Sequence, residues 1–165
     1  MDERLVGLSQ QVAGYNADPF TTFDPPVPEA ELAAAEAELG ITFPEPFRTF
    51  LREVSAGHSH GTFRFALNDA RAAGNTATPF PLRHADHPAA IALGEVVDAA
   101  DDAPGTFLVW NHGCGEESRL VVAGPERGHV WRRVETGWCA EGDPDAEAPV
   151  PLDYAGWLAW WFEVW

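Results

Sequence analysis

The stretch TFLVWNHGCGEESRLVVAGPERGHVWRRVE, residues 106–135, decides the fold. Residues 106–110 and 119–123 are apolar runs of strand length, and residues 129–135 alternate between apolar and polar positions. Turns that contain glycine separate the three runs. Because connections this short join antiparallel neighbours, the stretch predicts an antiparallel meander of three strands.

Two helices and a strand are predicted on the N-terminal side of the meander. Pro28 starts the first helix, glutamates in its first turn suit the positive end of the helix dipole, and Gly40 ends it. Alternation over residues 62–67 predicts the strand. The second helix opens at Pro44 and Pro46 and places apolar residues at i, i+3, i+4 and i+7: Phe47, Phe50, Leu51 and Val54.

Weaker patterns fill the remaining N-terminal and central segments. A helical stripe at Leu5, Leu8 and Val12 predicts a short helix. Residues 15–28 carry four prolines and predict a surface linker. Residues 68–90 predict irregular chain, and a short helix is expected over residues 91–100.

The C-terminal part predicts a loop and then a helix. Residues 136–151 are acidic, contain glycine and proline, and predict a loop. Asp153 is a typical N-cap residue. The helix that it caps carries one aromatic and apolar stripe: Tyr154, Trp157, Leu158, Trp161 and Trp165.

This order of elements predicts an α+β fold. We expect a single domain over residues 28–165, with a mainly antiparallel sheet, flanking helices and an aromatic C-terminal helix. Residues 1–27 are expected to be an N-terminal appendage and linker. A chain of 165 residues buries enough surface to fold without disulfide bonds.

Four stretches resemble the SUKH superfamily, the Smi/Knr-like proteins. The first two are LGITFPEPFRTFL at 39–51 and PFPL at 79–82. The third joins GCG at 113–115, LVVAGP at 120–125 and GHVW at 128–131, and the fourth is the aromatic helix around Trp157 and Leu158. Two positions depart from the family pattern: Ala56-Gly57-His58 replaces Asn-Gly-Gly, and Arg132 stands where an acidic residue or Asn is frequent.

The resemblance implies a SUKH-like fold and a binding function without catalysis. Many members of the superfamily are similar to immunity proteins that cover a cognate bacterial polymorphic toxin, often a nuclease or a deaminase. Others resemble eukaryotic scaffold-like regulators. An intracellular scaffold or regulatory protein-binding module is therefore the alternative to an immunity protein.

The charge of the chain favours a basic protein partner. Twenty-six acidic residues face ten arginines, and the chain has no lysine, which gives a net charge of −16. Such a field repels phosphate backbones and anionic lipid, so we expect neither nucleic-acid nor membrane binding. It attracts basic partners, although an acidic surface also serves solubility. The predicted partner is a basic toxin, bound by a protein that is monomeric when free.

The sequence shows neither a signal peptide nor an apolar stretch long enough to span a bilayer. We therefore expect a cytoplasmic protein. Its two cysteines, Cys114 and Cys139, are expected to be free thiols in that compartment.

Acids near the meander are the candidate partner-binding residues. They are expected to be solvated, with no strongly raised pKa values. Trp160 lies off the stripe of the last helix, so it either packs against the acidic loop or anchors a partner. The full candidate set is Asp101, Asp102, Glu116, Glu117, Glu141, Asp143, Asp145 and Trp160.

Two patterns suggest chemistry without completing a site. His112 and Cys114 resemble a nucleophile pair, but the sequence pattern indicates neither an orienting third group nor an oxyanion site. A structural turn is therefore the preferred interpretation. His58 and His60 resemble a metal pair that His84 and His87 would have to complete. The preferred interpretation is that these histidines are exposed to solvent in loops. We therefore expect no metal and no cofactor, and because neither pattern completes a catalytic site, we expect no enzyme.

Overall fold

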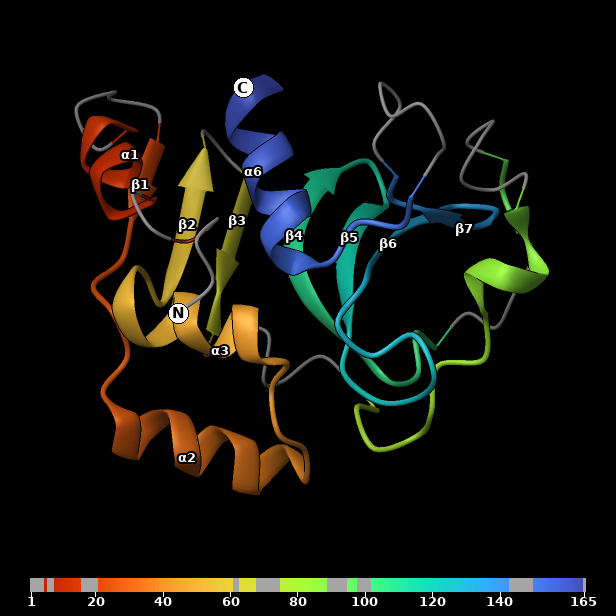
Figure 1. Cartoon of the computed structure of the whole chain (residues 1–165), viewed down its shortest axis with the longest axis horizontal. Coiled ribbons are helices and arrows are strands. Elements are labelled where there is room, and N and C mark those ends of the chain that lie inside the picture. Colours follow the sequence, from red (N-terminus) through yellow and green to blue (C-terminus); the bar gives the residue numbers. More distant parts are fainter. Residues whose placement is uncertain are drawn as a thin grey trace.

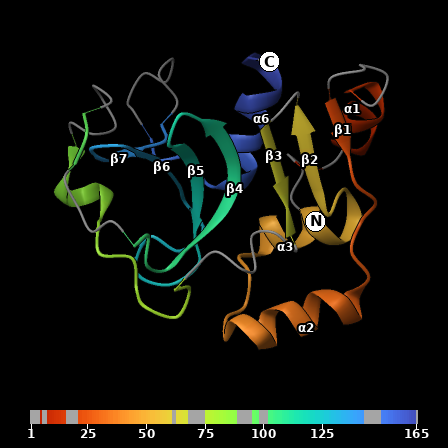
Figure 2. The ribbon, with the colours of Figure 1, turned by 180° about the vertical axis from the view of Figure 1, so that it is seen from behind.

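The computed structural model describes residues 5, 8–15, 21–60, 63–67, 75–88, 95–97, 102–142 and 150–164. Two antiparallel sheets and several helices form a mixed α+β fold, as predicted. In Figures 1 and 2 the sheets lie side by side, with β3 next to β4. The C-terminal helix runs over the junction between them (Figure 1).

The larger sheet contains the predicted meander. Its strands, in the order in which they pair, are β4 (Thr106–Gly113), β5 (Glu116–Val121), β6 (Val130–Val134) and β7 (Gly137–Ala140). The first three confirm the prediction, whereas β7 lies where a loop was expected. All four residues of β7 are buried. A strand covered on both faces lacks the alternation that identifies a half-exposed strand, so no periodic pattern predicted β7.

The smaller sheet pairs β1 (Thr21–Phe23), β2 (Gly57–His60) and β3 (Phe63–Ala66). The predicted strand at 62–67 is confirmed by β3. The prediction of a surface linker over residues 15–28 is wrong at β1, which pairs with β2 from Thr21 to Phe23. A strand of three residues is too short to show a period, and the prolines around it mask the signal.

The predicted helices are present as α1 (Leu8–Tyr15), α2 (Glu29–Leu39), α3 (Glu45–Glu53) and α6 (Tyr154–Val164). Gly40 ends α2 with a φ of 67°, in the left-handed region that favours glycine. Asp153 caps α6, because its Oδ1 accepts a hydrogen bond of 2.8 Å from the Gly156 amide. A short 3-10 helix, η2 (His84–Asp86), follows the PFPL segment at residues 79–82.

The helix expected over residues 91–100 is not found where the structure describes that segment, at residues 95–97. Val97 instead forms an antiparallel bridge with Trp138 of β7, with backbone bonds of 2.7 and 2.8 Å. The rest of that prediction lies outside the described residues. No helix in the described ranges is long and apolar enough to cross a membrane.

A separate hydrophobic cluster packs against each face of the larger sheet. The main core joins α3 and α6 to one face, and Phe47 contacts Tyr154 edge-to-face at 4.8 Å. On the other face, residues of the segment before η2 pack against the strands and form the second cluster. Its members are Phe80, Leu82, Ala103, Val121, Trp131, Trp138 and Ala140. The sheet is therefore buried on both sides.

Candidate functional site

The structure separates the predicted partner-binding acids. Asp102 is exposed and lies just before Thr106, the residue at which β4 begins. Glu116 is also exposed, but it pairs with Gly113 at the opposite end of the β4–β5 hairpin. From its first to its last residue β4 spans seven steps, which is about 23 Å at 3.3 Å per residue. Asp101, Asp143 and Asp145 lie outside the described residues.

Glu117 is neutralised within the sheet. Its Oε2 lies 2.7 Å from Nη1 of Arg119 and 3.7 Å from Nη1 of Arg133, on the face that carries the second cluster. Nε of Arg119 also donates a 2.9 Å hydrogen bond to Oγ1 of Thr106. Burial lowers the pKa of Arg119, and the neighbouring Glu117 opposes that shift. This carboxylate holds a buried arginine in place and is not freely available to a partner.

Glu141 corrects the expectation that these acids are solvated. Its residue is buried, with 9% of its surface exposed. Burial raises the pKa of this carboxyl, whereas the charge of Arg132 and a 3.3 Å hydrogen bond from Oγ of Ser118 lower it. Arg132 and Ser118 are register partners on the opposite face of the sheet from Glu117. Glu141 is therefore an internal polar group of the sheet.

The two residues of the suspected nucleophile pair, His112 and Cys114, lie in different surroundings. Nε2 of His112 lies 2.8 Å from Oγ of Ser118, and Ser118 has no exposed surface. Burial is the main cause that lowers the pKa of His112. Cys114 is exposed in the turn after β4, with a φ of 51°. The interpretation of a structural turn fits this arrangement, in which the histidine contacts a buried hydroxyl.

Trp160 is half-buried and packs against the main core. Its neighbour Trp161 is 3% exposed and belongs to that core. Trp160 therefore packs on the core with most of its surface, and the rest of the residue is exposed to solvent. Trp110 and Trp131 are buried, as their strand positions predict.

The histidines are arranged differently from the expected metal pair. His58 is not in a solvated loop: it lies in β2, is 2% exposed and stacks on Trp110. His84 is also buried, whereas His87, three residues later, is half-buried. The structure brings His84 together with two residues that the sequence analysis did not select, Glu126 and His129.

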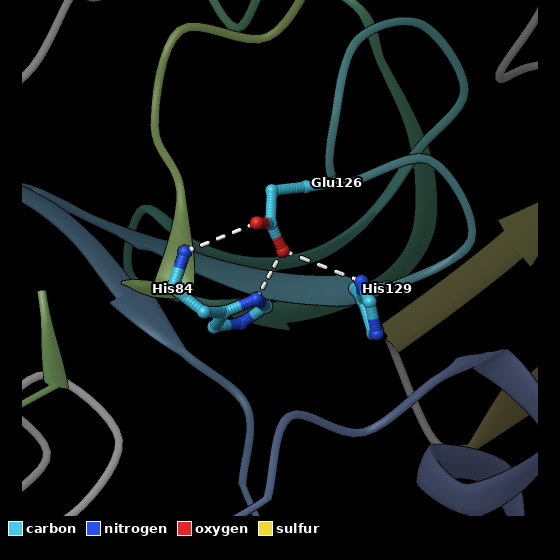
Figure 3. Close-up of side chains that lie close together, drawn as sticks. All are labelled: His84, Glu126 and His129. Carbon is cyan, nitrogen blue, oxygen red and sulfur yellow. Dashed lines mark hydrogen bonds and ion pairs between the residues drawn. The ribbon is translucent and has the colours of Figure 1, made fainter. Parts of the chain in front are cut away.

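His84, Glu126 and His129, which we call the His–Glu–His cluster, converge on one oxygen atom (Figure 3). Nδ1 of His84 contacts Oε2 of Glu126, and Nδ1 of His129 lies 3.3 Å from the same oxygen. The two imidazole rings meet edge-to-face, with centroids 5.1 Å apart. One possible ligand atom from each residue lies within 4.8 Å of the others.

The main chain and the second hydrophobic cluster position this group. The backbone amide of His84 donates a 3.1 Å hydrogen bond to Oε1 of Glu126, and the His84 ring stacks on Trp131 at 4.6 Å. Glu126 occupies the turn between β5 and β6. Arg127 anchors this turn through a 2.9 Å bond from Nη2 to the carbonyl of Thr42.

Burial lowers the pKa of His84, while the adjacent Glu126 carboxylate opposes that shift. Sequence spacing gave one weak signal for this cluster, since Glu126 and His129 are three residues apart. Nothing in the sequence pattern indicated that His84, 42 positions before Glu126, would join them.

Comparison with protein families gives a match over the N-terminal and central parts of the chain. The model of the SMI1 / KNR4 family (SUKH-1) matches residues 26–121, more than half of the chain. This span begins just before α2 and ends with β5. A comparison with curated proteins finds no match.

Proposed function

The chain belongs to the SMI1 / KNR4 family (SUKH-1), and on this premise we propose that it is an immunity protein without catalytic activity. Immunity-type proteins are a broad class within this superfamily. The proposed function is to bind a cognate bacterial toxin and cover the face with which the toxin acts.

The acidic surface is the observation that carries the proposal. Acids outnumber arginines by 16, and the exposed ones among the described residues occur along the chain from Asp24 to Glu135. A toxin that acts on nucleic acids needs a basic surface to bind phosphates, so it would be attracted to this field. Exposed acids among the described residues are Asp24, Glu29, Glu31, Glu38, Glu45, Glu53, Asp86, Glu95, Asp102, Glu116 and Glu135.

The polar groups of the larger sheet support binding over catalysis. Ser118 is fully buried and bonded, and Glu117 is paired with Arg119. A nucleophile has to reach its substrate, and a general base has to reach the proton that it removes. Both groups instead satisfy neighbours inside the sheet.

Co-expression tests the proposal. The chain is produced together with the toxin candidate encoded beside its gene, and growth is compared with cells that produce the toxin alone. We expect growth to be rescued and a stoichiometric complex to be recovered. A toxin from an unrelated system is the control and should not be neutralised. Unrescued growth in cells that contain the folded chain would contradict the proposal.

A further inference from the structure

We propose that the His–Glu–His cluster is a binding site for a divalent transition-metal ion, and that zinc suits it best. The three potential ligands come from two parts of the chain: His84 from η2, and Glu126 and His129 from the connection between β5 and β6. Their convergence within 4.8 Å is the observation on which the proposal rests.

The donor atoms match zinc in type, and one pair of them also matches it in spacing. Two imidazoles and one carboxylate are a ligand set that zinc uses, whereas calcium and magnesium prefer oxygen donors alone. Zinc binds such atoms at about 2.0–2.1 Å, so two ligands at neighbouring corners of a tetrahedron lie about 3.3 Å apart. Nδ1 of His129 and Oε2 of Glu126 are 3.3 Å apart.

An unsatisfied nitrogen provides a second observation. Nδ1 of His129 is buried and has no hydrogen-bond partner among the described residues. Burying such an atom without a partner costs free energy. An ion on the Nδ1 side would satisfy His129, which otherwise only approaches the carboxylate.

The surroundings hold the ligands in place. The His84 amide occupies Oε1 of Glu126, which leaves Oε2 directed at the two rings (Figure 3). Hydrogen bonds of this kind from the outer shell orient ligands and raise metal affinity. His129 is the most exposed member, with 36% of its side chain accessible.

Zinc titration of the full chain tests the site. The protein is treated with EDTA, dialysed and titrated with Zn²⁺ by calorimetry. Co²⁺ is used in parallel because its visible absorption reports coordination by nitrogen and oxygen. We expect one ion per chain. His129→Ala should weaken binding about 100-fold or more, beyond the loss typical for an outer-shell partner.

Two further variants make the test specific. Glu126→Gln removes the carboxylate charge and should also abolish tight binding. His87→Ala changes a nearby half-buried histidine outside the cluster and should leave the affinity unchanged. If Glu126→Gln does not fold, His129→Ala decides, because its side chain is more accessible. The absence of saturable Zn²⁺ binding by the wild-type chain, or binding that survives His129→Ala, would overturn the proposal.

Discussion

The imidazole of His58 lies stacked on the indole of Trp110, with ring centroids 4.5 Å apart and planes 13° from parallel. His58 belongs to β2 and Trp110 to β4, so this stack joins the two sheets. Trp161 of α6 contacts both rings, at 5.7 and 5.3 Å. The junction of the sheets and the C-terminal helix is therefore built around a buried histidine, whose pKa burial lowers to about 3.

Acid should destabilise the protein through His58. In the unfolded chain this histidine has a pKa near 6.5, so below that pH the unfolded state binds a proton that the folded state excludes. The contribution of neutral His58 is complete above about pH 6.5 and is lost as the pH falls towards 3, by up to roughly 1.4 kcal/mol per pH unit. Urea unfolding at a series of pH values measures this loss.

His58→Phe keeps an aromatic ring in the stack and removes the proton-binding site. We expect this variant to lose less stability than the wild type between neutral pH and pH 4. His87→Phe replaces a half-buried histidine outside the stack and serves as the control. Equal slopes for the wild type and His58→Phe would show that acid acts through the carboxylates alone.

The role of His58 also shows where sequence patterns stop being informative. The strand Gly57–His60 contains no aliphatic residue, so its composition suggested a solvated loop. It becomes a strand because β1 and β3 pair with it on both sides. Helices such as α3 were predictable, because an amphipathic period is a local property of the chain. Pairing between distant segments has no such local signature.

Truncating a buried tryptophan should cost far more than truncating Trp160. Trp131 has no exposed surface and contacts Phe80 at 5.4 Å, and Trp161 is 3% exposed. We expect Trp131→Ala or Trp161→Ala to lower the free energy of unfolding by about 3–5 kcal/mol. Half-buried Trp160 is the matched control on the same helix and should lose less. Chemical denaturation measures all three, and a wild-type midpoint for Trp161→Ala would contradict its place in the core.

The two thiols should react at very different rates. Cys114 is exposed in its turn, whereas Cys139 is buried in β7, where burial raises the pKa of its thiol. Because the thiolate is the reactive form, the native protein should react quickly at one cysteine with a thiol reagent. The second should react only after denaturation. Cys114→Ser is expected to remove the fast phase, and finding no thiol in denatured, unreduced protein would reveal a disulfide.

The candidate site was less predictable than the fold, for a physical reason. Charge counting indicated an acidic molecule, but it did not distinguish exposed Glu116 from Glu141. Glu141 is buried and accepts a hydrogen bond from Ser118. It also missed that Glu117 is neutralised by Arg119 two residues away, because alternate residues of a strand share a face. Sign and number are properties of composition, whereas availability to a partner depends on tertiary contacts.

The last prediction concerns the attraction of a basic toxin. We expect that replacing Asp101, Asp102, Asp143 and Asp145 together by Asn slows association and flattens its salt dependence. Long-range attraction mainly raises the association rate and is screened by salt. Close charge pairs in an interface add coupling energies of about 1.5–7 kcal/mol, and pairs at its rim add much less. Stopped-flow association with the toxin candidate at low and high salt measures both effects.

A control set separates local attraction from net charge. Replacing Asp24, Glu31, Glu38 and Glu45 by the corresponding amides also removes four negative charges, here from exposed positions before β2. If the four aspartates face the toxin, their removal slows association more than the control does. Equal slowing would mean that the whole acidic field attracts the toxin, because a distributed field depends on total charge. An unchanged rate and salt slope for both sets would assign these acids to solubility and place the docking surface elsewhere, which leaves the proposal of an immunity protein to the co-expression experiment.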